Sequence, residues 1–238
     1  MQFRKINFFT GSIALALLVF TLTGCLKKLD PPSNDPKSYI SIMHMASRAP
    51  SIEVYLNDQK ASQPILSGVF SSAYSGVTPG FFDIGFRKSG SDSVVASIPS
   101  QFYDSAKYYT LLLYNDQPTS AKAIRIVDNF SVLTQAQAYY RFFHLSADAP
   151  DVDLYLNSVK VQSNRQYLDN ISNTTYNGFV SYSPGSFSIE VKKAGTDSVI
   201  AQTSANMFQA NAFTIFLNGL ANLNGTNTIG LDVLQASN

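Results

Sequence analysis

Residues 44–57 read HMASRAPSIEVYLN, and residues 144–157 read HLSADAPDVDLYLN. Six of the fourteen aligned positions are identical, and most of the others are conservative exchanges such as Ile52 for Val152. The second copy begins 100 residues after the first, and no gap is needed to align them. A duplicated phrase of this kind predicts a chain built from two copies of one structural unit.

The duplication extends well beyond this phrase. Residues 79–86, PGFFDIGF, match residues 184–191, PGSFSIEV, and residues 109–113, YTLLL, match residues 213–217, FTIFL. Each unit is about a hundred residues long, which is a usual size for an independent domain. We therefore expect two tandem domains, at residues 38–131 and 137–236.

Each unit has the pattern of β structure. Apolar residues alternate with polar ones in 52–56 and 152–156, which is typical of half-buried strands. Phe82, Phe187 and the apolar residues that follow at every second position should lie on the core face, and Ser188 on the opposite face. Pro-Gly pairs and glycine-containing turns bound these strands. The sequence predicts an all-β fold of two antiparallel β-sandwiches, immunoglobulin-like or transthyretin-like, with six or seven strands per unit.

The two units resemble the DUF4397 family of bacterial exported proteins. The resemblance rests on Ala149-Pro150-Asp151-Val152-Asp153-Leu154-Tyr155 and Pro184-Gly185 in the second copy, together with Arg141 and Ser146. The first copy departs from the pattern at Ser47-Arg48 and Ser51. The resemblance implies no reaction, because this family is defined by sequence alone.

The N-terminus has the layout of an export signal. Arg4 and Lys5 precede an apolar run and a small-residue region, which predicts a signal peptide over residues 1–24. The end of this segment, Leu22-Thr23-Gly24-Cys25, resembles the lipobox of bacterial lipoproteins, which implies diacylglycerol attachment to Cys25. Cys25 is the only cysteine of the chain, and lipidation would account for an unpaired cysteine in an exported protein.

Residues 25–37 contain three prolines among polar neighbours, which predicts an extended tether between the lipid and the first domain. The residue after Cys25 is Leu26. An aspartate at this position would resemble the signal that retains lipoproteins in the inner membrane. We therefore expect lipid anchoring in the cell envelope, at the outer membrane, with the periplasmic or surface-facing side left open. The tether only weakly resembles the acidic export tags of Bacteroidota lipoproteins.

Composition argues against nucleic acid as a partner. Removal of Arg4 and Lys5 with the leader leaves 15 of the 17 basic residues against 16 acidic ones. Charged residues make up 14% of the chain, below the usual share of about 25%. A nucleic-acid-binding domain normally carries a basic patch, and none is indicated here.

Three sets of residues invite a chemical interpretation. His44 and His144 occupy the same place in each copy, but a zinc site needs three or four ligands, so we expect each ring to pack on the sheet and bond a nearby carbonyl. Asp148, Asp151 and Asp153 are spaced unlike an EF-hand loop, and calcium binding by the second unit stays a minor alternative. Tyr55 and Tyr155 should point away from the core, where they could contact a sugar or protein or be covered by packing.

No convergent set of titratable groups indicates catalysis. We expect no catalytic residue, cofactor or metal site, and we interpret the chain as a non-catalytic binding or structural module with an unidentified protein or glycan ligand. A carbohydrate-binding accessory lipoprotein is the first alternative, although the chain lacks tryptophan. A hydrolytic enzyme is the second and ranks last.

Overall fold

The computed structural model describes residues 35–117, 120–222 and 227–236. The predicted signal peptide, the lipobox with Cys25 and most of the predicted tether lie outside these residues. The described chain belongs to one compact unit that begins at Asp35. Within it, no helix is both long and apolar enough to cross a lipid bilayer.

The first repeat contains eight strands in the part of the chain that the structure describes. They form two sheets. The inner sheet, which faces the other repeat, has the order β4-β1-β7-β8, and the outer sheet has the order β3-β2-β5-β6. The strands are β1 (Ser38–His44), β2 (Ile52–Leu56), β3 (Gln59–Lys60), β4 (Ser75–Val77), β5 (Gly80–Lys88), β6 (Val94–Tyr103), β7 (Tyr108–Gln117) and β8 (Ser120–Asp128). A short 3-10 helix, η1 (Phe130–Val132), leads to the second repeat.

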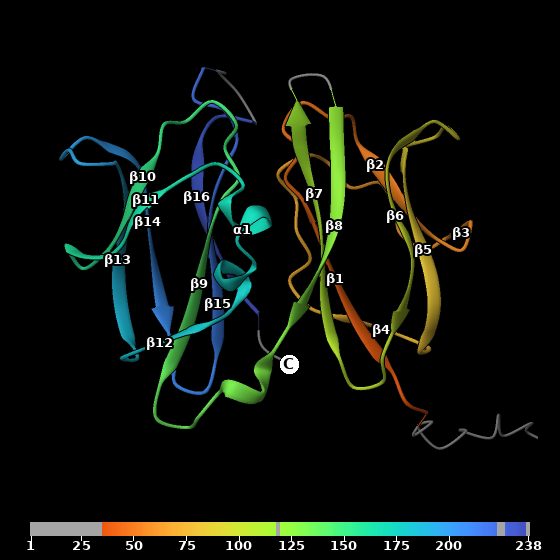
Figure 1. Ribbon diagram of the computed structural model, residues 1–238, viewed down its shortest axis with the longest axis horizontal. Coiled ribbons are helices and arrows are strands. Elements are labelled where there is room, and N and C mark those ends of the chain that lie inside the picture. Colours follow the sequence, from red (N-terminus) through yellow and green to blue (C-terminus); the bar gives the residue numbers. More distant parts are fainter. Residues whose placement is uncertain (1–34, 118–119, 223–226, 237–238) are drawn as a thin grey trace, which may run out of the picture. The chain divides into compact units, whose positions relative to one another are not determined.

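The second repeat has the same design (Figure 1), with an inner sheet of order β12-β9-β15-β16 and an outer sheet of order β11-β10-β13-β14. Its strands are β9 (Ala138–His144), β10 (Val152–Leu156), β11 (Val159–Arg165), β12 (Val180–Tyr182), β13 (Gly185–Lys193), β14 (Val199–Met207), β15 (Ala212–Asn218) and β16 (Gly230–Gln235). A four-residue helix, α1 (Asp169–Ser172), and a 3-10 turn, η2 (Thr174–Asn177), interrupt the β structure between β11 and β12.

The predicted all-β sandwich is confirmed, with two differences. Each repeat has eight strands in the described chain rather than the expected six or seven, and one pair of strands in each repeat runs in parallel. In each inner sheet the first strand pairs in parallel with the seventh: β1 runs beside β7 from Tyr39–Tyr108 to His44–Leu113, and β9 runs beside β15. The inner sheets are therefore mixed, whereas the strands of the outer sheets all pair antiparallel. Parallel neighbours need a long crossover, and the whole outer sheet of each repeat lies within that crossover.

Each repeat buries its own core between its two sheets. Ile84 and Phe86 of β5, and Phe187 and Ile189 of β13, all point into these cores. The predicted strand phase is therefore confirmed, since Ser188 lies on the exposed face. Phe82 points the same way as Ile84 but is only partly buried.

A third core joins the two repeats through their inner sheets. It contains Met43 and Leu112 of the first repeat together with Phe143 and Phe216 of the second, and all four side chains are 0% exposed. Strands β9 and β15 are consequently buried along their entire length. The sheets thus pack in the order outer, inner, inner, outer, and the apolar surface between repeats is a core in its own right.

Candidate functional site

The two histidines of the repeated phrase are structural. His44 and His144 end β1 and β9 with 0% exposure, and each Nε2 lies 3.0 Å from a carbonyl oxygen, of Pro50 and Pro150 respectively. This bond closes the loop that contains the repeated Ala-Pro. Burial lowers the pKa of both imidazoles, although the bond to the carbonyl opposes this effect. The predicted packing role, with a bond to a nearby carbonyl, is confirmed.

The asparagine that ends each phrase also has a structural task. Asn57 and Asp58 both have positive φ angles, of 47° and 61°, as do Asn157 and Ser158, of 48° and 64°. Two successive positive φ angles define the tight turn that suits a two-residue hairpin, and asparagine tolerates this conformation well. The Asn157 side chain also accepts from Ser188 N at 2.8 Å and donates to Ser186 O at 3.2 Å, which fixes the turn against β13.

The three aspartates considered for calcium do not converge. Asp148 accepts from the backbone N–H of Ala221 at 2.7 Å, and Asp151 accepts from the Gln166 side chain at 3.2 Å. Asp153 is buried and paired with Lys160 at 2.7 Å. Burial alone would raise the pKa of Asp153, but hydrogen bonds, chiefly from Lys160, hold it below its usual value. Among the described residues no group of three His, Cys, Asp or Glu is placed to hold a metal.

Tyr55 and Tyr155 lie outside the cores, as predicted, but neither ring is an open platform. The guanidinium of Arg87 lies 4.2 Å from the centre of the Tyr55 ring, and the ammonium of Lys192 lies 4.5 Å from that of Tyr155. These cation–π contacts cover the aromatic faces. A ligand would have to displace a charged side chain to stack on either ring.

Arg141 forms a buried ion pair that spans the two repeats, which sequence reasoning missed. Its Nη1 lies 2.6 Å from Oδ1 of Asp128, and the two side chains are 1% and 0% exposed. Asp128 also accepts from Thr110 at 2.6 Å and from Tyr74 at 2.8 Å, while Arg141 Nε donates to Thr214 at 2.9 Å. These bonds satisfy the buried charges, so the group is a structural tie between repeats rather than a reactive centre.

A second buried pair lies within the second repeat. Arg165 contacts Asp169 through two nitrogens, each 2.6 Å from a carboxylate oxygen, and its guanidinium stacks on Tyr176 at 3.8 Å. The pair holds α1 against β9, where Leu168 and Ile171 join the core between repeats. This charged pair therefore also serves the packing.

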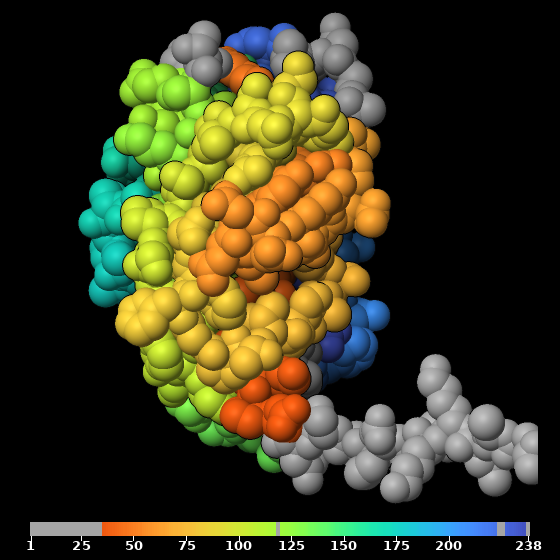
Figure 2. Space-filling view, turned by 90° about the vertical axis from the view of Figure 1, so that its right-hand side faces the viewer, coloured from red at the N-terminus to blue at the C-terminus, as the bar shows by residue number. Residues whose placement is uncertain are grey.

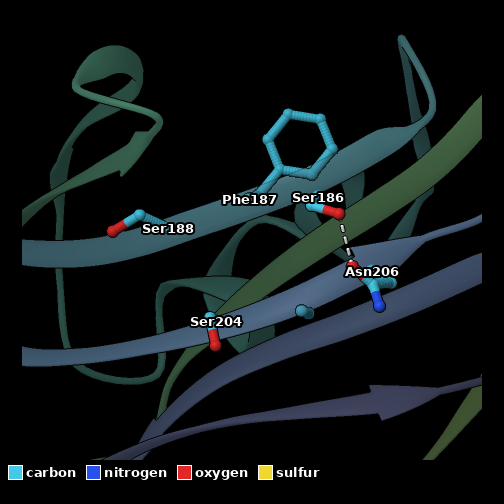
Figure 3. A pocket seen from close by; sticks show the side chains of 6 residues that line it. Ser186, Phe187, Ser188, Ser204 and Asn206 are labelled. Atoms are coloured by element: carbon cyan, nitrogen blue, oxygen red, sulfur yellow. Dashed lines mark hydrogen bonds between the residues drawn. The ribbon is translucent and has the colours of Figure 1, made fainter.

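A polar hollow lies on the outer sheet of the second repeat (Figure 3). Its volume is about 380 Å³, and its walls come from β13 and β14: Ser186, Phe187, Ser188, Ser204, Ala205 and Asn206. The strands are in register there, with Ser186 opposite Asn206 and Ser188 opposite Ser204. The side chains at these four outward positions are short, so the surface of the sheet is recessed there.

The chemistry of the hollow suits a neutral, polar ligand. Ser186 Oγ donates to Asn206 Oδ1 at 2.6 Å, which leaves the amide nitrogen of Asn206 available as a donor. Within the described chain the hydroxyls of Ser188 and Ser204 make no hydrogen bond. The hollow adjoins a second one, of about 670 Å³, which shares Ser186 and Asn206 and extends to Phe208, a side chain 56% exposed.

These features define a tandem β-sandwich protein with a core between its repeats and a polar hollow on one outer sheet. The chain belongs to the family described as Domain of unknown function (DUF4397), whose model matches residues 38–155 and 138–237. The first match extends into the second copy of the repeated phrase and ends at residue 155, so the two matches overlap from residue 138 to 155. A search of the curated proteins found no match.

Proposed function

We propose that this chain is a lipid-anchored cell-envelope protein, at the outer membrane, that acts as a non-catalytic binding or structural module. The anchoring part rests on the sequence. Leu22-Thr23-Gly24-Cys25 follows an apolar leader, and Cys25 is the only cysteine of the chain. One acyl chain holds a protein only marginally at a bilayer, whereas two or more give stable attachment.

Labelling with palmitate tests the anchor. The wild-type chain should incorporate the label and fractionate with membranes, and Cys25→Ser should do neither. Equal labelling of the two chains would refute the lipid anchor.

The binding part rests on the polar hollow of the second repeat. The charged groups buried elsewhere are used internally, since Arg141 pairs with Asp128 and Arg165 with Asp169. The hollow instead presents the hydroxyls of Ser188 and Ser204 and the amide nitrogen of Asn206, which have no hydrogen-bond partner among the described residues, on a surface fixed by two paired strands. Ligand sites generally combine such convergent polar groups with an apolar surface.

Carbohydrate binding is a second candidate, favoured by Phe208. This exposed side chain lines the adjoining hollow together with Asn206. A flat aromatic surface next to hydroxyl and amide groups matches the alternating apolar faces and hydroxyls of a sugar ring. A hydrolase is disfavoured, because both histidines are buried and bonded to carbonyl oxygens.

A glycan array with the full chain tests both statements. Ser188→Tyr would fill the hollow with a bulky side chain and should abolish any glycan signal. Ser97→Tyr places the same side chain at an exposed position of β6 on the outer sheet of the first repeat, and it should bind like wild type. A signal that survives Ser188→Tyr would show that the hollow is not the binding surface.

A further inference from the structure

The outer sheet of the first repeat carries an exposed aromatic pair. Phe81 of β5 and Phe102 of β6 are directly opposite in the strand register, and their rings are 5.1 Å apart. They are 65% and 46% exposed. Isolated exposed apolar residues are common, but adjacent ones that point outward from a sheet mark an interaction surface more often.

The second repeat shows that the fold does not require this pair. The corresponding positions, one residue after the glycine that starts β13 and one before the end of β14, are Ser186 and Asn206. There a hydrogen bond replaces the ring contact. The aromatic pair is therefore a feature of the first repeat alone.

The pair lies where the described chain begins. The Ser38 hydroxyl donates to Tyr103 O at 2.9 Å and to Asp104 O at 2.7 Å, so the start of β1 is fixed beside the residue that follows Phe102. Figure 2 faces the outer sheet of the first repeat, and the earliest described residues, in red, lie at its lower edge. Only twelve residues separate Ser38 from Cys25, so their reach is at most about 40 Å.

We infer that Phe81 and Phe102 dock into the interfacial layer of the membrane that holds the lipid anchor, which orients the protein with this end toward the bilayer. The inference rests on the proposed lipidation of Cys25. Aromatic side chains partition to the boundary between headgroups and acyl chains, and such binding scales with the apolar area that is buried. A short tether that ends beside the pair keeps it at a high local concentration near the surface.

The charges at this end are balanced, so the apolar contact should dominate. Three basic and three acidic residues lie on the neighbouring segments: Lys37, Lys107, Arg125, Asp35, Asp83 and Asp104. Asp58, in the turn whose Asn57 donates to Phe81 O, is neutralised by its pairing with Arg87. Docking should therefore occur on neutral vesicles and should change little with salt concentration, in contrast to binding by a basic patch.

Tryptophan fluorescence of the full, processed chain tests the inference directly. The natural chain has no tryptophan, so Phe81→Trp introduces a single reporter, and Phe102→Trp supplies an independent one. Val94→Trp is the matched control, because Val94 is 63% exposed and starts β6, eight residues before Phe102. Each variant is reconstituted into phosphatidylcholine vesicles with or without bromine on the acyl chains, which quenches nearby tryptophan.

We expect Phe81→Trp and Phe102→Trp to emit at shorter wavelength and to lose most of their emission in brominated vesicles, while Val94→Trp keeps its emission. If the chain sediments with vesicles but no reporter is quenched, the docking is refuted and the anchor stands. If the chain does not sediment with vesicles, the anchor itself is refuted and the docking with it. A concentration-dependent blue shift without quenching would mean that a second copy covers the pair, which also refutes docking.

Discussion

Replacement of Arg141 by methionine should destabilise the whole protein far more than the loss of a surface ion pair. Methionine keeps much of the side-chain length but leaves Asp128 as a buried carboxylate with only Thr110 and Tyr74 as donors. Removal of one partner of a buried pair typically costs about 3–5 kcal/mol. For a unit of roughly 200 residues, this corresponds to a fall in melting temperature of about 6–20 °C.

Urea denaturation followed by far-ultraviolet circular dichroism measures the change in the free energy of unfolding. Arg87→Met is the matched control, because Arg87 pairs with Asp58, whose side chain is 82% exposed, and such pairs are worth about 1 kcal/mol or less. The double variant Asp128→Asn, Arg141→Met removes both charges and should recover part of the loss. The reasoning is refuted if Arg141→Met costs no more than Arg87→Met, or if the double variant is as unstable as Arg141→Met alone.

Four further outcomes are expected. Residues 38–131 and 137–238, expressed separately, should associate when mixed, because each would expose half of the core between repeats; sedimentation velocity that shows only monomers would contradict this. Phe187→Ala should cost about 3–5 kcal/mol as a buried aromatic cavity, whereas Ser188→Ala on the exposed face should be nearly neutral, and similar losses in urea denaturation would contradict the strand phase. Burial lowers the pKa of His144 from its usual 6.5, so the stability that its neutral ring contributes is fully present above about pH 6.5 and is lost as the pH falls through its folded pKa. His144→Gln should therefore reduce the fall in melting temperature below about pH 6.5, and an unchanged pH dependence would show that the imidazole does not titrate there. Neither EDTA nor excess calcium should move the melting temperature, and a chelator-induced fall of several degrees would restore the calcium alternative.

The β fold and the strand phase could be predicted because they depend on local pattern. Alternation in residues 52–56 and 152–156 reflects strands with an apolar face toward the core, and the structure places Val54 and Leu154 in the cores. The carboxylates on the opposite face, Glu53 and Asp153, are also buried, at 5% and 2% exposed, which the alternation alone does not predict. Because the phrase occurs in both repeats, a role shared by the two copies has to depend on residues that both copies contain. Each copy offers one histidine, whereas a zinc site needs three or four ligands, so a packing role for His44 and His144 could be predicted.

The pairing of the repeats was harder to predict. The unbroken apolar runs at residues 111–113 and 215–217 indicate burial on both faces, but the sequence does not say what covers the second face. The parallel pairing of β1 with β7 was also missed, since register between strands some seventy residues apart leaves no local signal. Short polar residues such as Ser188 and Ser204 are equally uninformative, because they form a hollow only when two strands bring them opposite each other.

The ion pair between Arg141 and Asp128 shows a similar limit. The two residues are close in sequence but belong to different repeats, and the first repeat has Ser41 at the position of Arg141. Arg141 stood out only as part of a family resemblance. Its partner follows from the packing of the inner sheets, which no pattern within one repeat contains.

The parallel contact between β1 and β7 has a mechanical consequence. A pulling force on the segment before Ser38 would be transmitted to the folded domain through β1. This strand is paired along six residues with β7 and along three with β4. The hydrogen bonds between parallel strands are evenly spaced and slanted from one strand to the other, so a pull along β1 loads them together in shear rather than opening them one at a time. Forced unfolding is governed by the rate of unfolding, and hydrogen bonds that are loaded together in shear slow it. The strand nearest the tether, β1, should therefore resist being pulled out of its sheet.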